Sequence, residues 1–275
     1  MDSTLKKLQE TQTEILNIID RICREHDIKY SLYAGSLLGA VRHEGFIPWD
    51  DDLDICMMRS DYDKFIKIWE ELSPEGYILQ NKENTRTFTQ TFTKIRKEHT
   101  TFLQYDFERG AYHTGIFVDI FPMDRIPNGG IKKILFRWNC MKYILFTREF
   151  IPEKSSTYVK FVSKMILNTT PKRIRMDKRS KLLKKITKYK EGKKYSIVGI
   201  ETIDSLRKVK SYDIFDEIIE LPFENNKICC IKKWDEELKI HYGDYMKLPP
   251  VEERTWTHHP IILDFEHSYE ELVNE

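Results

Sequence analysis

The chain has 275 residues, of which 40% are apolar and 32% charged, and its 45 Lys and Arg residues nearly balance its 44 Asp and Glu residues. This composition is typical of a globular protein with a sizeable core, and it gives no reason to expect a nucleic-acid partner. No stretch reaches the ~18 apolar residues of a transmembrane helix, the start Met1–Lys7 is too polar for a signal peptide, and the five cysteines form no CxxC pair. We therefore expect a cytoplasmic protein with buried, reduced thiols.

Apolar periodicity and turn residues predict the first elements. In chain order these are a helix over about 3–25, a strand over 30–33, a brief helix over 37–42, a strand over 51–58 and a helix over about 60–72. The segment Ala34-Gly35-Ser36 separates the first strand from the second helix. In the strand over 51–58, we expect Asp52 and Asp54 to point to one face and Leu53 and Ile55 to the other.

The rest of the chain predicts further strands and a helical middle. The strands are expected over 76–80, 88–95, 100–106, 115–121 (ended by Pro122), 195–200 and, around a turn at 224–226, two within 215–231. Residues 130–190 are helical and basic, with interruptions at Pro152 and Pro171, and a short helix follows over 234–242. We therefore predict an α+β fold in one domain over 1–275: a mixed β-sheet flanked by helices, with a basic helical insertion at about 127–192.

The run Asp50-Asp51-Asp52-Leu53-Asp54 places four carboxylates in five residues, which repel one another unless a cation is present. Two carboxylates on one face of a strand suit Mg²⁺ or Mn²⁺, and Asp119, alone in an apolar strand, is a candidate third ligand. A solvated turn is the simplest alternative, but the apolar neighbours argue against it. An EF-hand is excluded because its glycine position is Ile55. The Asp-x-Asp site of a glycosyltransferase stays open.

The Gly35-Ser36 turn adds a second feature. Glycine lets a phosphate approach the backbone closely, and the start of a helix presents N–H donors to an anion. Most Gly-Ser turns are plain turns. Followed by Asp-x-Asp on a strand and later by a lone strand aspartate, the turn matches the pattern of enzymes with the nucleotidyltransferase fold.

Three blocks of the sequence carry a more specific signature. The first runs from Ala34 to Ile55, the second from Gly115 to Asp124, and the third from Tyr242 to Pro250, with Arg254 following it. Together they resemble the LicD family, which includes bacterial phosphocholine transferases and, more distantly, fukutin and fukutin-related protein. The similarity frames nearly the whole chain and is weakest over 127–195. It shows no departure at the carboxylate positions.

This resemblance implies a nucleotidyltransferase-like fold and a transferase activity. The implied donor is a CDP-linked alcohol, with CDP-choline the first candidate. The implied acceptor is a hydroxyl of a cell-surface glycan (lipopolysaccharide, teichoic acid or capsule polysaccharide) or of its lipid-linked precursor, and CMP is released. By analogy, Asp52 and Asp54 would bind Mg²⁺ or Mn²⁺, Asp119 would complete the site or accept the hydroxyl proton, and Gly35-Ser36 would bind the diphosphate.

Basic residues are needed to balance that diphosphate. Arg42, Lys94, Arg96 and Arg254 are the candidates for phosphate contact, with an ordinary surface charge as the alternative for each. Among the neighbours of the motifs, Asp50 and Asp51 are expected to fix the loop, Trp49 to anchor it or stack on a base or a choline ammonium, and His258-His259 to lie at the surface or the acceptor site.

The apolar and basic segment 131–146 has two interpretations. It is a helix packed on the sheet with a solvated face, or a peripheral helix that meets a lipid-linked acceptor at the inner face of the cell membrane. Two other functions also stay open for the whole chain. One is a nucleotidyltransferase or glycosyltransferase acting on a nucleotide-linked donor, and the other is a catalytically silent binding protein of the same fold.

Overall fold

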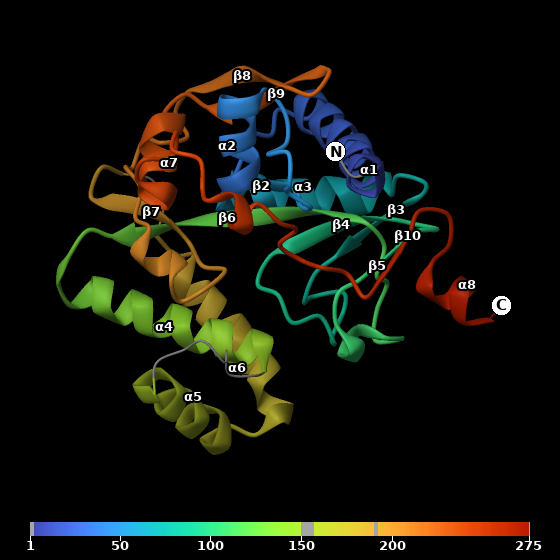
Figure 1. The fold of residues 1–275 in the computed structure, drawn as a ribbon. Coiled ribbons are helices and arrows are strands. Elements are labelled where there is room, and N and C mark those ends of the chain that lie inside the picture. Colours follow the sequence, from blue (N-terminus) through green and yellow to red (C-terminus); the bar gives the residue numbers. More distant parts are fainter. Residues whose placement is uncertain (1–2, 150–156, 190–191, 275) are drawn as a thin grey trace. The chain divides into compact units, whose positions relative to one another are not determined.

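The computed structural model describes residues 3–149, 157–189 and 192–274 (Figure 1). The helices are α1 (Ser3–Glu25), α2 (Ala34–His43), α3 (Arg59–Leu72), α4 (Gly130–Arg148), α5 (Thr157–Thr169), α6 (Lys172–Ile186), α7 (Trp234–Tyr242) and α8 (Tyr269–Asn274). The strands are β1 (Ser31–Leu32), β2 (Asp54–Met58), β3 (Tyr77–Gln80), β4 (Thr93–Lys97), β5 (Thr101–Leu103), β6 (Phe117–Pro127), β7 (Tyr195–Gly199), β8 (Ile218–Phe223), β9 (Asn226–Ile231) and β10 (Ile262–Asp264). The predicted α+β class with a mixed sheet is confirmed.

The chain forms two compact units. The first contains residues 1–80, 93–121 and 214–275, and the second contains residues 81–92 and 122–213. The predicted helical insertion at 127–192 lies inside the second unit. The prediction that 1–275 form a single domain stays a prediction.

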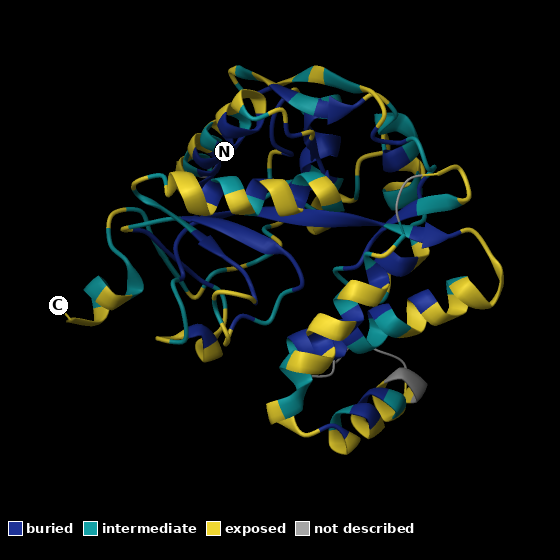
Figure 2. Ribbon diagram, turned by 180° about the vertical axis from the view of Figure 1, so that it is seen from behind, coloured by how far each residue is buried: buried dark blue, intermediate teal, exposed yellow. Residues whose placement is uncertain are grey.

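The main sheet of the first unit has the strand order β1-β2-β6-β4-β3. Strands β4 and β6 pair antiparallel with Lys94 opposite Asp119. The backbone N–H of Asp119 donates to the carbonyl of Leu53 at 2.9 Å, so the end of the acidic loop lies directly beside β6. Figure 2 shows β6 buried along nearly its whole length, as the apolar sequence around Asp119 predicts.

Two amphipathic helices close this core. Helix α1 buries a stripe that includes Leu8, Ile15 and Ile19, each fully buried, and α3 buries Phe65 and Trp69. Apolar residues at helical spacing can be buried on one face only, so both helices keep a charged outer face. The hairpin β8–β9 turns at Glu224-Asn225, within the predicted turn. Together these elements hold the acidic segment at the edge of a rigid core.

The predicted strand over 51–58 is wrong in its first three residues, because β2 begins only at Asp54. Asp51, Asp52 and Leu53 form a loop whose polar groups bond to other elements instead of to a neighbouring strand. The brief helix also starts earlier than predicted, so Gly35 and Ser36 belong to the first turn of α2. The prediction that Asp52 and Asp54 share one strand face is therefore replaced by a loop residue next to a strand residue.

The prediction that Pro122 ends its strand is also wrong. Strand β6 continues through Pro122 to Pro127. Its pairing with β4 covers 117–120, and its pairing with β7 starts at Met123. Proline lacks an N–H donor, and here it stands between the two ladders, where no ladder bond is needed.

Two further strands have other bounds than predicted, and two elements were not predicted. The strand expected over 88–95 begins at Thr93, and the one expected over 100–106 shortens to β5, which pairs with β10. Strand β10 and helix α8 lie in a segment where the sequence indicated no regular structure. β5 and β10 have only three residues each, which is too short for a local pattern to define them, so their pairing depends on distant partners.

The second unit has its own core, built mainly by α4, α6 and β7. Phe136, Cys140 and Ile144 of α4 pack with Leu182 and Ile186 of α6. The helical middle predicted for 130–190 is confirmed where it is described, and Pro171 is the residue before α6. The interruption predicted at Pro152 lies outside the described residues. No helix within the described ranges is long and apolar enough to cross a membrane.

Candidate active site

Two buried glutamines of α1 anchor the backbone of the acidic loop. Gln9 Nε2 donates to the carbonyl of Asp50 at 2.9 Å, and Gln12 Nε2 donates to the carbonyl of Asp51 at 3.0 Å. Both glutamines are about 1% exposed or less. A buried polar side chain is retained where it satisfies a backbone group. These two bonds fix the backbone that carries Asp50, Asp51 and Asp52.

Asp54 is the carboxylate least compensated by the protein. Its backbone N–H donates to Ser36 Oγ at 2.8 Å, but its side-chain Oδ1 is buried and has no hydrogen-bond partner. The pKa of Asp54 lies well above its ordinary value because burial disfavours the charged form, and because Asp52, Asp119 and Asp50 add negative charge. A buried carboxylate oxygen without a donor is costly unless a cation is bound there.

The carboxylates of Asp52 and Asp50 lie near Asp54, and their negative charges repel each other. Burial and the charge of Asp119 raise the pKa of Asp52, while His258 lowers it. Burial and the charge of Asp52 raise the pKa of Asp50 further, and the two carboxyl groups share a hydrogen bond. Such a pair holds a proton between its members in the absence of a cation.

The third predicted carboxylate, Asp119, lies close enough to affect both Asp52 and Asp54. Its two oxygens accept hydrogen bonds from Lys94 Nζ at 2.7 and 2.9 Å. Both side chains are about one-tenth exposed. Burial lowers the pKa of Lys94, and the neighbouring Asp119 works against that shift. Lys94, which the sequence predicted to contact phosphate, forms a buried ion pair with Asp119.

Asp51, unlike its acidic neighbours, has a structural role in the loop. It is fully buried, and its carboxylate accepts the backbone N–H groups of Thr257 and His258 at 3.0 and 2.9 Å. The imidazole of His258 lies 3.2 Å from the same carboxylate through Nδ1 and 3.7 Å from Asp52 Oδ2 through Nε2. Burial lowers the pKa of His258, but Asp51 and Asp52 outweigh that effect and raise it. Asp51 therefore fixes the loop, as predicted, and holds His258 at the acidic cluster.

Gly35 has a steric role at the start of α2. A Cβ at this position would lie 2.9 Å from Asp50 Oδ2, so any other residue would displace that carboxylate. Ala34, just before it, has a left-handed φ of 45°, which turns the chain sharply from β1 into α2. The hydroxyl of Ser36, in the first turn of this helix, accepts the backbone N–H of Asp54, so the start of α2 lies next to the start of β2.

Two of the predicted basic residues are brought together by the tertiary structure. Arg42 donates to the carbonyl of Tyr245 at 3.0 Å, and Arg254 donates to the carbonyl of Pro249 at 3.0 Å. The pKa of Arg42 is lowered by burial and by the charge of Arg254. Neither guanidinium forms an ion pair with a carboxylate among the residues that the structure describes. Two close cations without an acidic partner favour an anionic ligand.

Tyr242 connects this arginine pair to the carboxylates. Burial has the largest effect on Tyr242 and raises its pKa, and the negative charges of Asp54, Asp50 and Asp52 raise it further. Tyr242 in turn raises the pKa of Arg42. The ring is 44% exposed, so a bound molecule can reach it. The sequence missed Tyr242 and the position of His258, although both lie in or near the third signature block.

Arg96 and Trp49 are engaged by the protein itself. Arg96 is 3% exposed and donates to Gln80 Oε1 and to the carbonyl of Gly115, both at 2.7 Å. Its guanidinium lies 5.2 Å from the centre of the Phe117 ring. The Trp49 ring carries the guanidinium of Arg254 at 5.4 Å. Trp49 thus stacks on an arginine, and Arg96 ties β4 to the start of β6.

Comparisons with known proteins identify the family to which this chain belongs. The family model described as LicD/FKTN/FKRP, nucleotidyltransferase domain, matches residues 27–167. The chain is also 31% identical over 260 residues to the lipopolysaccharide cholinephosphotransferase LicD of Haemophilus influenzae, covering 90% of this chain and 94% of that protein. This chain belongs to the LicD family. The family membership that the sequence blocks predicted is confirmed, and with it the prediction of a transferase domain.

Two shorter similarities involve proteins of unassigned function. The uncharacterized protein RT0683 of Rickettsia typhi is 34% identical over 88 residues, which is 30% of this chain and 28% of that protein. The uncharacterized protein RP689 of Rickettsia prowazekii is 30% identical over 125 residues, 43% of this chain and 47% of that protein. These relatives add no information on substrate.

A residue of this LicD family member can hold a metal only if its ligand atoms are not already used in hydrogen bonds. Within the described chain, Asp51, Asp52 and His258 form the only group with three ligand atoms within 4.8 Å of one another. The oxygens of Asp51, however, already accept two backbone N–H groups. Asp52 and the partnerless Oδ1 of Asp54 have open positions, and an all-oxygen set fits Mg²⁺ or Mn²⁺. Asp119 affects the pKa of both residues, and its own oxygens accept hydrogen bonds from Lys94.

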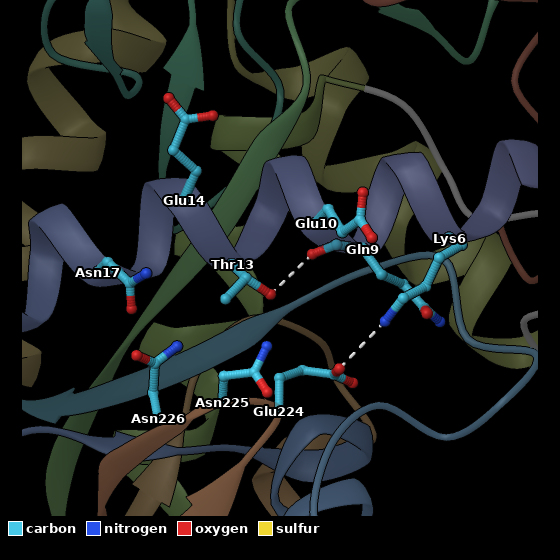
Figure 3. Close-up of a pocket in the computed structure, with 9 residues that line it drawn as sticks. All are labelled: Lys6, Gln9, Glu10, Thr13, Glu14, Asn17, Glu224, Asn225 and Asn226. Atoms are coloured by element: carbon cyan, nitrogen blue, oxygen red, sulfur yellow. Dashed lines mark hydrogen bonds and ion pairs between the residues drawn. The ribbon is translucent and has the colours of Figure 1, made fainter.

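A polar surface pocket lies elsewhere on the first unit (Figure 3). Its volume is about 300 Å³, and α1 and the β8–β9 turn line it. Lys6 Nζ and Glu224 Oε2 form an ion pair across it at 3.2 Å. None of the predicted site residues lines this pocket. The carboxylates around Asp54 therefore remain the candidate active site.

Ser36→Ala is expected to destabilise the protein by about 1–3 kcal/mol, because it leaves the buried Asp54 N–H without its acceptor. Urea unfolding measures the change. Ser60→Ala, at an exposed serine at the start of α3, is the matched control and should stay within about 0.5 kcal/mol of the parent. Equal stability of the two variants would show that the Ser36–Asp54 bond is not a structural link.

Proposed function

We propose that this LicD family member transfers phosphocholine from CDP-choline to a hydroxyl of lipopolysaccharide or a similar cell-surface glycan, or of its lipid-linked precursor, and releases CMP. The activity for which the Haemophilus influenzae relative is named, lipopolysaccharide cholinephosphotransferase, supports the transferred group and the acceptor class. One structural observation carries the proposal: a buried, partnerless carboxylate oxygen on Asp54 amid the charges of Asp50, Asp52 and Asp119. The proposal places the reaction in the cytoplasm, at the inner face of the membrane when the acceptor is lipid-linked.

The donor would be held by two groups of opposite character. Asp52 and Asp54, with Asp119, would hold Mg²⁺ or Mn²⁺, which when bound neutralises the diphosphate and the developing charge on phosphorus. Arg42 and Arg254 would contact the phosphate oxygens from the other side, as their proximity and their lack of acidic partners favour. The N–H groups at Gly35-Ser36 would add donors at the start of α2.

The transfer itself is a displacement at the phosphorus that bears choline. The acceptor oxygen forms a new bond to this phosphorus, the anhydride P–O bond breaks, and CMP leaves with the bridging oxygen. Asp119 would accept the proton of the acceptor hydroxyl. Lys94 supports this role because its ammonium group holds both oxygens of Asp119 in place, and each carboxylate oxygen keeps a second lone pair for a proton.

Other chemistries on the same site are distinguished by their products. A nucleotidyltransferase would release pyrophosphate or transfer the nucleotide, and a glycosyltransferase would release a nucleoside diphosphate. A silent binding protein would release nothing. The intact set Asp52, Asp54, Asp119 argues against the silent alternative, because Lys94 and His258 only partly compensate these charges and Asp54 Oδ1 keeps no hydrogen-bond partner among the described residues.

The purified protein, given Mn²⁺ and a panel of CDP-choline, CDP-ribitol and CDP-glycerol with a lipopolysaccharide acceptor, is expected to release CMP and form a phosphodiester, fastest from CDP-choline. EDTA and Asp52→Asn should each lower the rate by at least about 10³-fold. Product analysis by mass spectrometry reads the transferred group.

Three results would contradict the proposal. They are activity of Asp52→Asn near the parent level, release of pyrophosphate or CDP, and equal activity with and without EDTA. Faster transfer from another CDP-alcohol would keep the reaction type and replace choline as the cargo.

A further inference from the structure

Helix α4 exposes an apolar stripe on the side opposite its core residues. Ile131, Ile134, Leu135 and Trp138 are 66%, 65%, 51% and 41% exposed. Their spacing places them on one face of the helix. Helix α4 buries its other face, from Phe136 to Thr147, in the core of the second unit. The stripe is therefore not needed to build that core.

Helix α5, which contacts α4, carries further exposed apolar side chains. It packs against α4 within the second unit (Figure 1), and its Phe161 and Met165, one helical turn apart, are 68% and 50% exposed. Single exposed apolar residues are common on any protein surface, but six large ones on two neighbouring helices indicate a binding surface.

The charged side chains on α4 and α5 are all basic. Neither α4 nor α5 contains an acidic residue, and Lys132, Lys160 and Lys164 are exposed among the apolar residues. Burial and the charges of Lys185 and Lys178, both on α6, lower the pKa of Lys142, so these three ammonium groups lie close together. Lys142 Nζ is 5.4 Å from the centre of the Trp138 ring. The basic cluster is thus continuous with the apolar stripe.

We propose that this surface, formed by Ile131, Ile134, Leu135, Trp138, Phe161, Met165 and the lysine cluster, binds the surface of a bilayer that contains anionic lipids. Lysine is depleted from the cores of protein–protein interfaces, whereas exposed apolar side chains mixed with lysines, with a tryptophan among them, suit acyl chains below anionic headgroups. The inference goes beyond the proposed function, because it concerns the second unit and no residue of the active site. It gives the enzyme a way to stay where a lipid-linked acceptor is found.

The test is flotation of the full chain with vesicles of phosphatidylcholine alone and of phosphatidylcholine mixed with phosphatidylglycerol. We expect binding to the mixed vesicles only, and a fall in partition of roughly tenfold or more for Ile134→Glu/Trp138→Glu and for Lys142→Glu/Lys178→Glu. These positions are exposed or half-buried, so the variants should keep the parent circular dichroism and Tm. Leu72→Glu, at a residue of α3 that is 49% exposed, is the matched control and should bind like the parent.

Two outcomes overturn the proposal. One is no binding of the parent to anionic vesicles, or equal binding of the parent and both double variants. The other is a concentration-dependent dimer in sedimentation that Ile134→Glu/Trp138→Glu abolishes while vesicle binding is absent, which would assign the surface to a second copy of the chain. Neither outcome affects the proposed transferase activity, which is measured without membranes.

Discussion

Replacing Asp54 by Asn is expected to abolish the proposed phosphocholine transfer and at the same time to make the metal-free protein more stable. The transfer rate should fall by at least about 10³-fold, because the variant would lose a proposed metal ligand that lies among three other carboxylates. The stability should rise by roughly 1–3 kcal/mol, because an amide removes one of several buried like charges. An amide also supplies N–H donors to the carboxylates around it.

Thermal unfolding in EDTA and in Mn²⁺ measures both parts of this prediction. The parent should gain stability from Mn²⁺ and the variant should gain little, since a ligand that binds only the folded state raises Tm. Asp216→Asn, at an exposed aspartate of the first unit, is the control and should change neither activity nor Tm. An Asp54→Asn variant that is less stable than the parent in EDTA, or that keeps its activity, would remove Asp54 from the proposed metal site.

Replacing Lys94 by Met is expected to have the second largest effect. Removing one member of a buried ion pair leaves the other charge uncompensated, which costs about 3–5 kcal/mol. The charge on Asp119 would then add to those of Asp52 and Asp54 without its counter-ion. We expect transfer to fall by about 10²-fold, because Asp119, the proposed proton acceptor, would lose the two hydrogen bonds that position its carboxylate.

Urea unfolding of a double-mutant cycle tests this interpretation. Asp119→Asn added to Lys94→Met should recover most of the lost stability, because it removes the unpaired charge. The control is Lys97→Met on the same strand, whose ion pair with Glu14 is solvent-exposed and worth at most about 1 kcal/mol. A Lys94→Met variant as stable as Lys97→Met would show that Lys94 is not the counter-ion of Asp119.

Local sequence was sufficient for the elements whose pattern is set by neighbours in the chain. Helix α7 begins and ends as predicted, and α1 follows its apolar periodicity, because an amphipathic helix is specified by residues three and four positions apart. The family blocks also predicted that Asp52, Asp54 and Asp119 belong together, and in the structure these three carboxylates lie close enough to affect one another. Chemistry that resides in a contiguous motif can be read from the chain, because the motif carries both the ligands and the turn that positions them.

What the tertiary structure decided is which groups compensate those charges. Asp51 and His258 are far apart in sequence, and nothing near either one indicates the other. Lys94 meets Asp119 only because β4 and β6 pair in one register, and a shift of one residue would turn Lys94 to the opposite face of the sheet. The start of β2 and the passage of β6 through Pro122 were likewise set by distant partners. The sequence by itself determined the acidic residues and the family, whereas hydrogen bonds and ion pairs between remote segments decided how each acidic residue is held, because electrostatic compensation depends on distance in space and not on distance along the chain.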